Sequence, residues 1–86
     1  MVLSQAVKRF ENMKNNPRDN WDMADIEVVC NYFDIECEAP ARGSHYCVSH
    51  KSQASILTIP KKRKIKAVYI IEFVSFVDGV RSNSDG

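Results

Sequence analysis

The middle of the chain contains three short segments in which apolar and polar residues alternate as in half-buried β-strands, separated by turn-forming residues. The expected strands cover residues 35–41, 45–50 and 55–59. Strands that follow one another through such short turns pair as an antiparallel meander. The first strand contains Pro40, which has no N–H to donate to a neighbour, so this strand is expected to lie at a sheet edge or to be bulged.

Helical periodicity precedes these strands. Apolar residues at three- and four-residue steps predict a first helix over about 3–14, which Pro17 and the asparagines before it bring to an end. A second helix is expected to begin at Asp22, whose carboxylate can accept hydrogen bonds from the free N–H groups of the first turn. Asp25 stands at the third helical position, and Trp21 is expected to pack on Ile26 across the helix start.

Residues 65–77 are rich in β-branched and aromatic residues, a composition that favours a strand. The polar residues Glu72, Ser75 and Asp78, however, recur every third position, which suits a helix. A helix is therefore predicted, with Gly79 as its C-terminal stop and residues 81–86 as a disordered tail.

Length and composition indicate one small domain, expected over residues 1–80. A chain of 86 residues buries only about 60% of the surface that its unfolded form exposes, so its core is small. It has no apolar run of the roughly 20 residues that a membrane span needs, and no secretory leader. The three cysteines lack the spacing of a disulfide framework. A soluble cytoplasmic protein with reduced thiols is expected.

The net charge of +1 hides a strong separation of charge along the chain. Residues 19–38 contain seven acids and no lysine or arginine, whereas residues 39–71 contain seven lysines and arginines and no acid. A ligand meets a local patch and not the net charge, so the near-neutral total does not argue against nucleic acid. A solvated lysine-rich loop with no ligand is the structural alternative for the basic block.

A glycine turn, Gly43-Ser44, delivers His45 to the start of the second expected strand, and the basic block begins about fifteen residues later, at Lys61. Histidine can take and give a proton near neutral pH. A proton-transfer group near a block of positive charge suggests chemistry on a polyanion, and RNA is the polyanion that fits best. RNA carries its own nucleophile, the 2′-hydroxyl, so neither a metal nor a cofactor is expected.

These features resemble the HicA family of bacterial toxins, small ribonucleases of type II toxin–antitoxin pairs. The resemblance covers roughly residues 20–80. It rests on the order and spacing of four features, namely Gly43-Ser44-His45, His50, Thr58-Ile59-Pro60 and the basic run from Lys61 to Lys66. Two positions depart from the family pattern, because Val48 stands where an aromatic residue is usual and Lys51 where a proline is usual.

The resemblance implies an α+β fold like that of a double-stranded-RNA-binding domain, α-β-β-β-α, here with an extra N-terminal helix and a three-stranded antiparallel sheet. It implies cleavage of mRNA by a metal-independent endonuclease with His45 as catalytic residue, and inhibition by a HicB-type antitoxin. The candidate RNA-binding residues are those of the turn and the basic loop: Arg42, Gly43, Ser44, Lys61, Lys62, Arg63, Lys64 and Lys66. Nothing in the sequence indicates the oligomeric state.

Two other functions are open at this point. One is a module of the same fold that holds structured RNA by its shape and does not cut it. The other is a zinc site made by Cys37, His45, Cys47 and His50. The zinc site is disfavoured because His50 falls on the other face of the strand from His45 and Cys47, and because no recognised ligand spacing is present.

Overall fold

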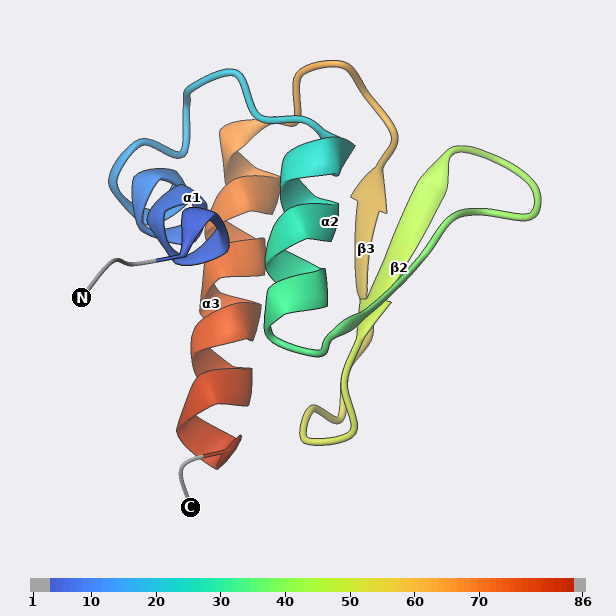
Figure 1. Cartoon of the computed structure of the whole chain (residues 1–86). Helices are drawn as coiled ribbons and strands as arrows, with labels where there is room; N and C mark the ends of the chain where they lie inside the picture. The colour runs from blue at the N-terminus through green and yellow to red at the C-terminus, as the bar shows by residue number, and fades with distance from the viewer. Residues whose placement is uncertain (1–3, 85–86) are drawn as a thin grey trace.

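The computed structural model describes residues 4–84, which form three helices and one three-stranded antiparallel sheet (Figure 1). The elements in chain order are α1 (Gln5–Asn15), α2 (Met23–Tyr32), β1 (Glu36–Glu38), β2 (His45–Ser49), β3 (Leu57–Pro60) and α3 (Ala67–Ser84). This confirms the small α+β fold with its antiparallel meander. None of the helices in residues 4–84 has the length and apolar character that crossing a membrane requires.

The strands pair in the order β1-β2-β3, so β1 lies at an edge, as its proline predicts. In the register, Cys37 lies opposite Val48 and Tyr46 lies opposite Ile59. The outer strands are shorter than expected. Continuing the β1 register would place Pro40 opposite His45, and proline has no N–H for the ladder. Between β2 and β3 the chain reverses over residues 50–56, where the N–H of Gln53 donates to the carbonyl of His50, so β3 begins only at Leu57.

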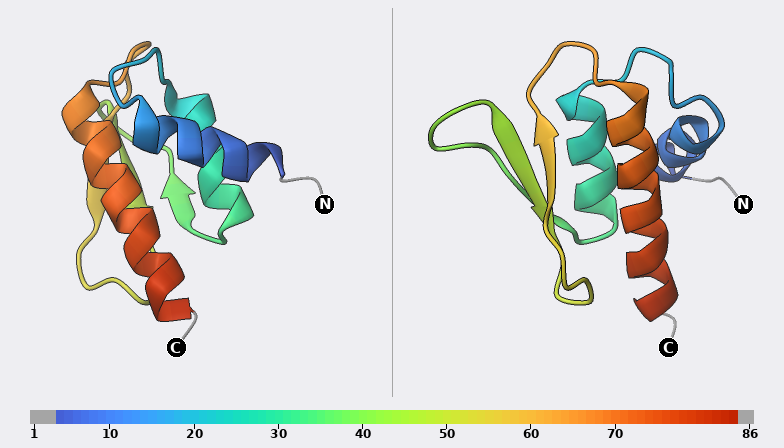
Figure 2. Two further views of the ribbon diagram at one scale, coloured as in Figure 1. Left: turned by 90° about the vertical axis from the view of Figure 1, so that its left-hand side faces the viewer. Right: turned by 180° about the vertical axis from the view of Figure 1, so that it is seen from behind.

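The helices all lie on one side of the sheet and form two layers (Figure 2). The α2 and α3 helices lie next to the strands, α2 against β1 and α3 against β3. The α1 helix packs on α2 and α3 from the far side and lies outside the sheet layers. One face of the sheet is therefore covered by helices, and the other face is left open.

The core fills the space between the sheet and the helices. The three helices and two of the strands each contribute a fully buried apolar side chain, namely Phe10 from α1, Ile26 from α2, Val48 from β2, Ile59 from β3 and Phe73 from α3, and β1 contributes the half-buried Cys37. Val48, which stands where the resembled family has an aromatic residue, is completely buried in this cluster. A valine at this position therefore still fills a core site.

The helix starts follow from local sequence. The Asp22 carboxylate accepts a hydrogen bond from the N–H of Asp25, and the Asp25 carboxylate accepts one from the N–H of Asp22, which completes a capping box at the start of α2. Arg9 of α1 donates to the same Asp25 carboxylate at 2.7 Å, so α1 is tied to the capped end of α2. Trp21 packs on the core, and its indole N–H donates to the carbonyl of Asn16.

The C-terminal end of α3 corrects two expectations. Gly79 does not stop the helix, and residues 81–84, expected in a disordered tail, are helical. The helix continues because Val80 is buried and the Arg81 guanidinium lies over the rings of Phe10 and Phe33, at 5.8 and 5.1 Å from their centroids. Residues 85–86 of the expected tail, and residue 3 of the expected first helix, lie outside the described residues.

Gly79 has a packing role inside α3. A Cβ placed on it would lie 2.8 Å from the amide nitrogen of Gln53, which belongs to the loop between β2 and β3. The absence of a side chain at this position lets the Gln53 amide rest against the helix backbone. The loop is thereby held close to the last turns of α3.

Candidate active site

The open face of the sheet carries polar side chains. Successive side chains along each strand point to opposite faces of the sheet. The residues that face the helices are Cys37, Tyr46, Val48, Leu57 and Ile59, and those on the open face are all exposed or half-buried. The open-face residues are Glu36, Glu38, His45, Cys47, Ser49 and Thr58. The predicted separation of His45, Cys47 and Ser49 from Tyr46 and Val48 is confirmed.

His45 is the first residue of β2 and is exposed. The register pairs it with Pro60, the last residue of β3, immediately before the basic loop. Thr58 and Glu38 are its diagonal neighbours on the open face, because both pair with Cys47, two residues along β2. The register therefore places a threonine on one neighbouring strand and a glutamate on the other, both diagonal to His45 on the open face.

The glycine turn and the basic loop are joined by the backbone. The N–H of Lys61 donates a hydrogen bond to the carbonyl oxygen of Ser44, one residue beyond the last pair of the β2–β3 ladder. Gly43 adopts φ = 81°, a left-handed conformation that favours glycine. This conformation turns the chain so that Ser44 enters β2 in the correct register. The two motifs that the sequence separates by more than ten residues are thus held side by side.

The basic loop follows β3 and leads into α3. Its cations are all exposed, namely Lys61, Lys62, Arg63, Lys64 and Lys66, whereas Ile65 between them is buried and anchors the loop in the core. The N–H of Ile65 also donates to the carbonyl of Trp21 at 2.8 Å. An anchored loop with exposed cations presents a fixed patch of positive charge to a ligand.

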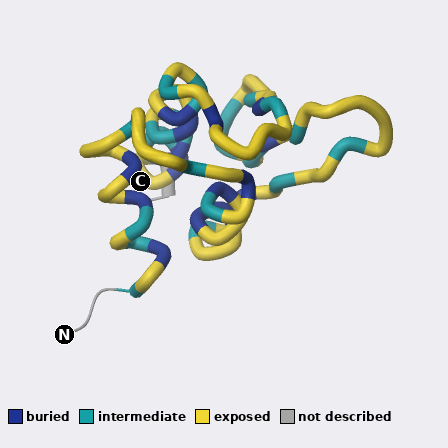
Figure 3. Tube along the Cα trace, turned by 90° about the horizontal axis from the view of Figure 1, so that it is seen from above, coloured by how far each residue is buried: buried dark blue, intermediate teal, exposed yellow. Residues whose placement is uncertain are grey.

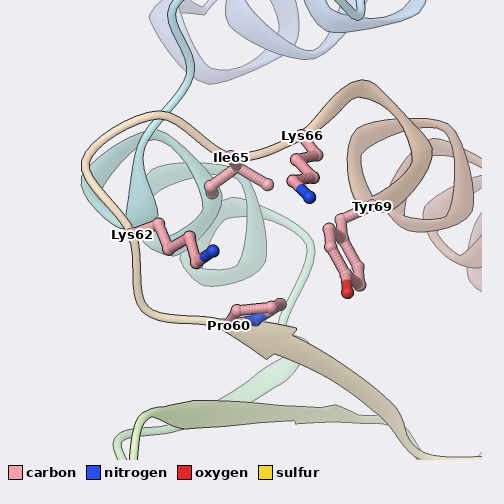
Figure 4. Close-up of a pocket in the computed structure, with 5 residues that line it drawn as sticks. All are labelled: Pro60, Lys62, Ile65, Lys66 and Tyr69. Carbon is pink, nitrogen blue, oxygen red and sulfur yellow. The ribbon is translucent and has the colours of Figure 1, made fainter.

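A small pocket of about 40 Å³ lies between this loop, the end of β3 and the start of α3. Figure 4 shows the side chains of Lys62 and Lys66 extending toward the same space, which Pro60, Ile65 and Tyr69 enclose. Two ammonium groups near a half-buried tyrosine suit an anionic oxygen better than an apolar ligand. Tyr69 was not predicted as a site residue, because its position in a helical pattern indicates only a core role.

Arg42 lies in the loop between β1 and β2, in a stretch that stands away from the body of the protein (Figure 3). Residues 41–45 are all exposed. Arg42 and Ser44 are therefore accessible, and Ser44 is the one that is bonded to the basic loop.

The two carboxylates of β1 are the residues that sequence reasoning did not assign to the site. Glu36 and Glu38 occupy the open face at the edge opposite the basic loop, and the Ser49 hydroxyl lies 3.5 Å from a Glu36 carboxylate oxygen. The open face therefore grades from negative at β1 to positive beyond β3. The alternation of β1 was visible in the sequence, but the pairing of β1 with β2, which places Glu38 opposite Cys47, was not.

The second histidine of the motif lies away from the first. His50 follows the end of β2, five residues and roughly 16 Å along an extended chain from His45. Its Nδ1 accepts a hydrogen bond from the N–H of Ser52 at 3.0 Å and lies 2.8 Å from the Ser52 hydroxyl. His50 therefore organises the turn after β2 and cannot share one phosphate with His45.

The four residues of the zinc alternative do not converge. Cys37 faces the helices, His45 and Cys47 lie on the open face, and His50 lies beyond the end of the strand. Within residues 4–84, no group of three histidine, cysteine or acidic side chains could hold a metal ion.

Comparisons with protein families, with curated proteins and with solved structures find no match for this chain.

Proposed function

We propose that this protein is a metal-independent endoribonuclease that cleaves mRNA with His45 as its proton-transfer residue. The observation that carries the proposal is the β2–β3 register, which pairs His45 with Pro60 and brings the basic loop to the same end of the sheet. An exposed imidazole and a group of exposed cations then lie at the same end of the sheet.

The reaction needs three contributions. The 2′-hydroxyl of the substrate attacks the adjacent phosphorus, and His45 takes its proton or gives one to the leaving oxygen. Charge on the phosphate increases as the new bond forms, and in this proposal the ammonium groups of Lys62 and Lys66, which line one pocket beside the end of β3, stabilise it. The remaining cations, Lys61, Arg63 and Lys64, hold the RNA backbone without reading its sequence.

The charge gradient of the open face gives the RNA a direction. Glu36 and Glu38 repel phosphates at the β1 edge, while the loop beyond β3 attracts them. The backbone of the RNA therefore runs along the β3 side and past His45, and it avoids the β1 edge. His45 lies between the two regions, where the scissile phosphate meets both the imidazole and the basic loop.

The fold that goes with this proposal is that of a double-stranded-RNA-binding domain, formed by α2, the three strands and α3, with α1 as an addition. The element order and the helices on one face support it. The proposed partner is an acidic antitoxin of the HicB type, which would cover the basic loop and His45. Binding of such a partner to the folded state alone would also stabilise this small domain.

The experiment is incubation of the purified protein with single-stranded and double-stranded RNA in the presence of a chelator, beside a DNA copy of the same sequence. We expect cleavage of RNA and no cleavage of DNA, because the 2′-hydroxyl is the nucleophile. Products ending in a 2′,3′-cyclic phosphate identify this reaction. Cleavage of the DNA copy contradicts the reaction class.

A second candidate is a module that binds RNA without cleaving it. The observation that favours it is that the His45 side chain has no hydrogen-bond partner in the part of the chain described, so nothing holds the imidazole in one tautomer. Binding of intact RNA by the wild-type protein, with no product under any salt condition, identifies this function instead.

A further inference from the structure

Two of the three cysteines meet between α2 and β1, away from the open face of the sheet. Cys30 lies in the last turns of α2 and is 1% exposed, and Cys37 is the central residue of β1, half-buried and facing the helices. Both are free thiols, and both line the same surface pocket at the side of α2 and β1. The third cysteine, Cys47, faces the opposite side of the sheet.

The tight connection between α2 and β1 brings the two thiols together. Asp34 adopts φ = 59°, in the left-handed region, and the N–H of Ile35 donates to the carbonyl of Cys30 at 2.8 Å. The chain therefore reverses immediately after the helix, and β1 packs against α2. The fold thus places the two cysteines on neighbouring elements, where both face one pocket.

One member of the pair, Cys37, is also accessible from solvent. A shallow surface pocket of about 440 Å³ is lined by both cysteines, with Glu27 and Asn31 of α2 among its other residues. A small polar oxidant can reach the Cys37 sulfur through this pocket, since Cys37 is only half-buried. Cys30 lies behind it as the second, protected thiol.

We propose that Cys30 and Cys37 form an oxidisable dithiol, which a hydroperoxide such as hydrogen peroxide converts into an intramolecular disulfide between α2 and β1. The site is independent of the proposed nuclease function and uses none of its residues.

The two thiols differ in acidity, and this difference determines which one reacts with the peroxide first. The hydrogen bond donated by Cys30 lowers the pKa of Cys37, against the opposing effects of burial and of Glu27. The same hydrogen bond, together with burial, raises the pKa of Cys30. Cys37 is thus the thiol that reacts first, because the thiolate is the nucleophile.

The reaction is balanced in two steps. The Cys37 thiolate attacks one peroxide oxygen, the O–O bond breaks, and the released hydroxide takes up a proton to give water and a sulfenic acid. The Cys30 sulfur then attacks the Cys37 sulfur, the S–O bond breaks, and hydroxide leaves with the thiol proton as a second water. The two thiols lose two electrons, which reduce the peroxide, and thiol–disulfide exchange with a reductant reverses the change.

The test uses the full chain carrying Cys47→Ser, so that Cys30 and Cys37 are the only thiols. After treatment with a small excess of hydrogen peroxide, we expect both thiols to disappear, the mass of the chain to fall by about 2 Da, and no disulfide-linked dimer to form. Cleavage of the chain at Asp34 or Glu36 should leave the two cysteine peptides joined until a reductant is added. Dithiothreitol should restore both thiols.

The matched control is Cys37→Ser in the same Cys47→Ser background, which leaves Cys30 alone in the core. We expect its single thiol to resist the same treatment and no fall in mass to occur. The proposal is overturned if the protein with the intact pair keeps both thiols under conditions that oxidise Cys47 in the wild-type chain. It is also overturned if that protein gains oxygen atoms or forms linked dimers while its mass does not fall. Because Cys47 is exposed, the Cys47→Ser protein is expected to fold as the wild type does.

Discussion

The N–H of Lys61 donates a hydrogen bond to the carbonyl oxygen of Ser44, and this single bond joins the glycine turn to the basic loop. It extends the β2–β3 ladder by one step past the pair formed by His45 and Pro60. The position of His45 relative to the cations is therefore set by backbone pairing and does not depend on a flexible side chain. The predictions about activity depend on this relationship.

Replacing His45 with alanine should remove cleavage and leave RNA binding intact. Loss of a positioned proton-transfer group should lower the rate by about 10²–10⁴-fold. The side chain is exposed, so the free energy of unfolding should change by no more than about 0.5 kcal/mol. Cleavage rate, RNA affinity and urea unfolding measure the three quantities. His50→Ala is the matched control and should remain active, and full activity in folded His45→Ala contradicts the mechanism.

Replacing Lys62 and Lys66 together should weaken RNA binding and make it less dependent on salt. If each ammonium contacts one phosphate, the slope of log affinity against log salt should fall in magnitude by about 1.4 for single-stranded RNA. Titrations at several salt concentrations provide the slope. The control is Lys8→Ala with Lys51→Ala, which removes the same charge from exposed positions outside the loop. Equal changes in both double variants indicate a general charge effect and no specific site.

Gly79→Ala should stabilise the protein more strongly when Gln53 is shortened. Alanine in place of glycine inside a helix stabilises it by roughly 1 kcal/mol, but here the new Cβ meets the Gln53 amide at 2.8 Å. In a Gln53→Ala background the full gain should be seen, and in the wild-type background a smaller one. Urea unfolding of the wild type, the two single variants and the double variant gives the free energies of unfolding for this double-mutant cycle. Equal gains in both backgrounds show that Gln53 does not restrict this position.

Arg81→Ala should destabilise the protein by about 1–2 kcal/mol, since the guanidinium lies over two aromatic rings at an exposed site. The neighbouring substitution Ser82→Ala, on an exposed residue, should change the free energy of unfolding by less than about 0.5 kcal/mol. Urea unfolding compares the two variants. A cost for Arg81→Ala no larger than that for Ser82→Ala shows that the ring contacts add nothing.

At neutral pH, Cys37 should react with iodoacetamide faster than an equally buried cysteine whose pKa is not lowered. Its pKa is lowered, chiefly by the hydrogen bond from Cys30, so more of it is thiolate at any pH below the ordinary value. The rate should fall as the pH is lowered through this reduced pKa, because only the thiolate reacts. Alkylation followed by peptide mass analysis gives the rate at each pH. In Cys30→Ala the hydrogen bond is gone, and the profile should move to higher pH.

The helix starts and the alternation of β2 were predictable because they depend on residues close together in sequence. Asp22 and Asp25 are three positions apart and form their capping box within one turn. The helical period of α3 also prevailed over its β-prone composition, because its polar residues recur every third position and Phe73 and Val77 share the buried face.

The remaining features depend on contacts between distant segments. Gly79 looked like a helix stop, but it serves a contact with Gln53, 26 positions earlier in the chain. Arg81 looked like part of a tail, but α1 and the end of α2 bring the rings of Phe10 and Phe33 beneath it. The diagonal placement of Glu38 relative to His45 likewise depends on the β1 register, which no local pattern specifies.

The bond between Lys61 and Ser44 uses main-chain atoms on both sides, so the side chains at these two positions are free to vary. Only proline at position 61 would remove the donor. Single substitutions can thus change the charge and shape of the glycine turn and the basic loop while the backbone pairing beside His45 stays in place. In the proposed nuclease, this tolerance separates the side chains that recognise RNA from the backbone that positions the proton-transfer residue.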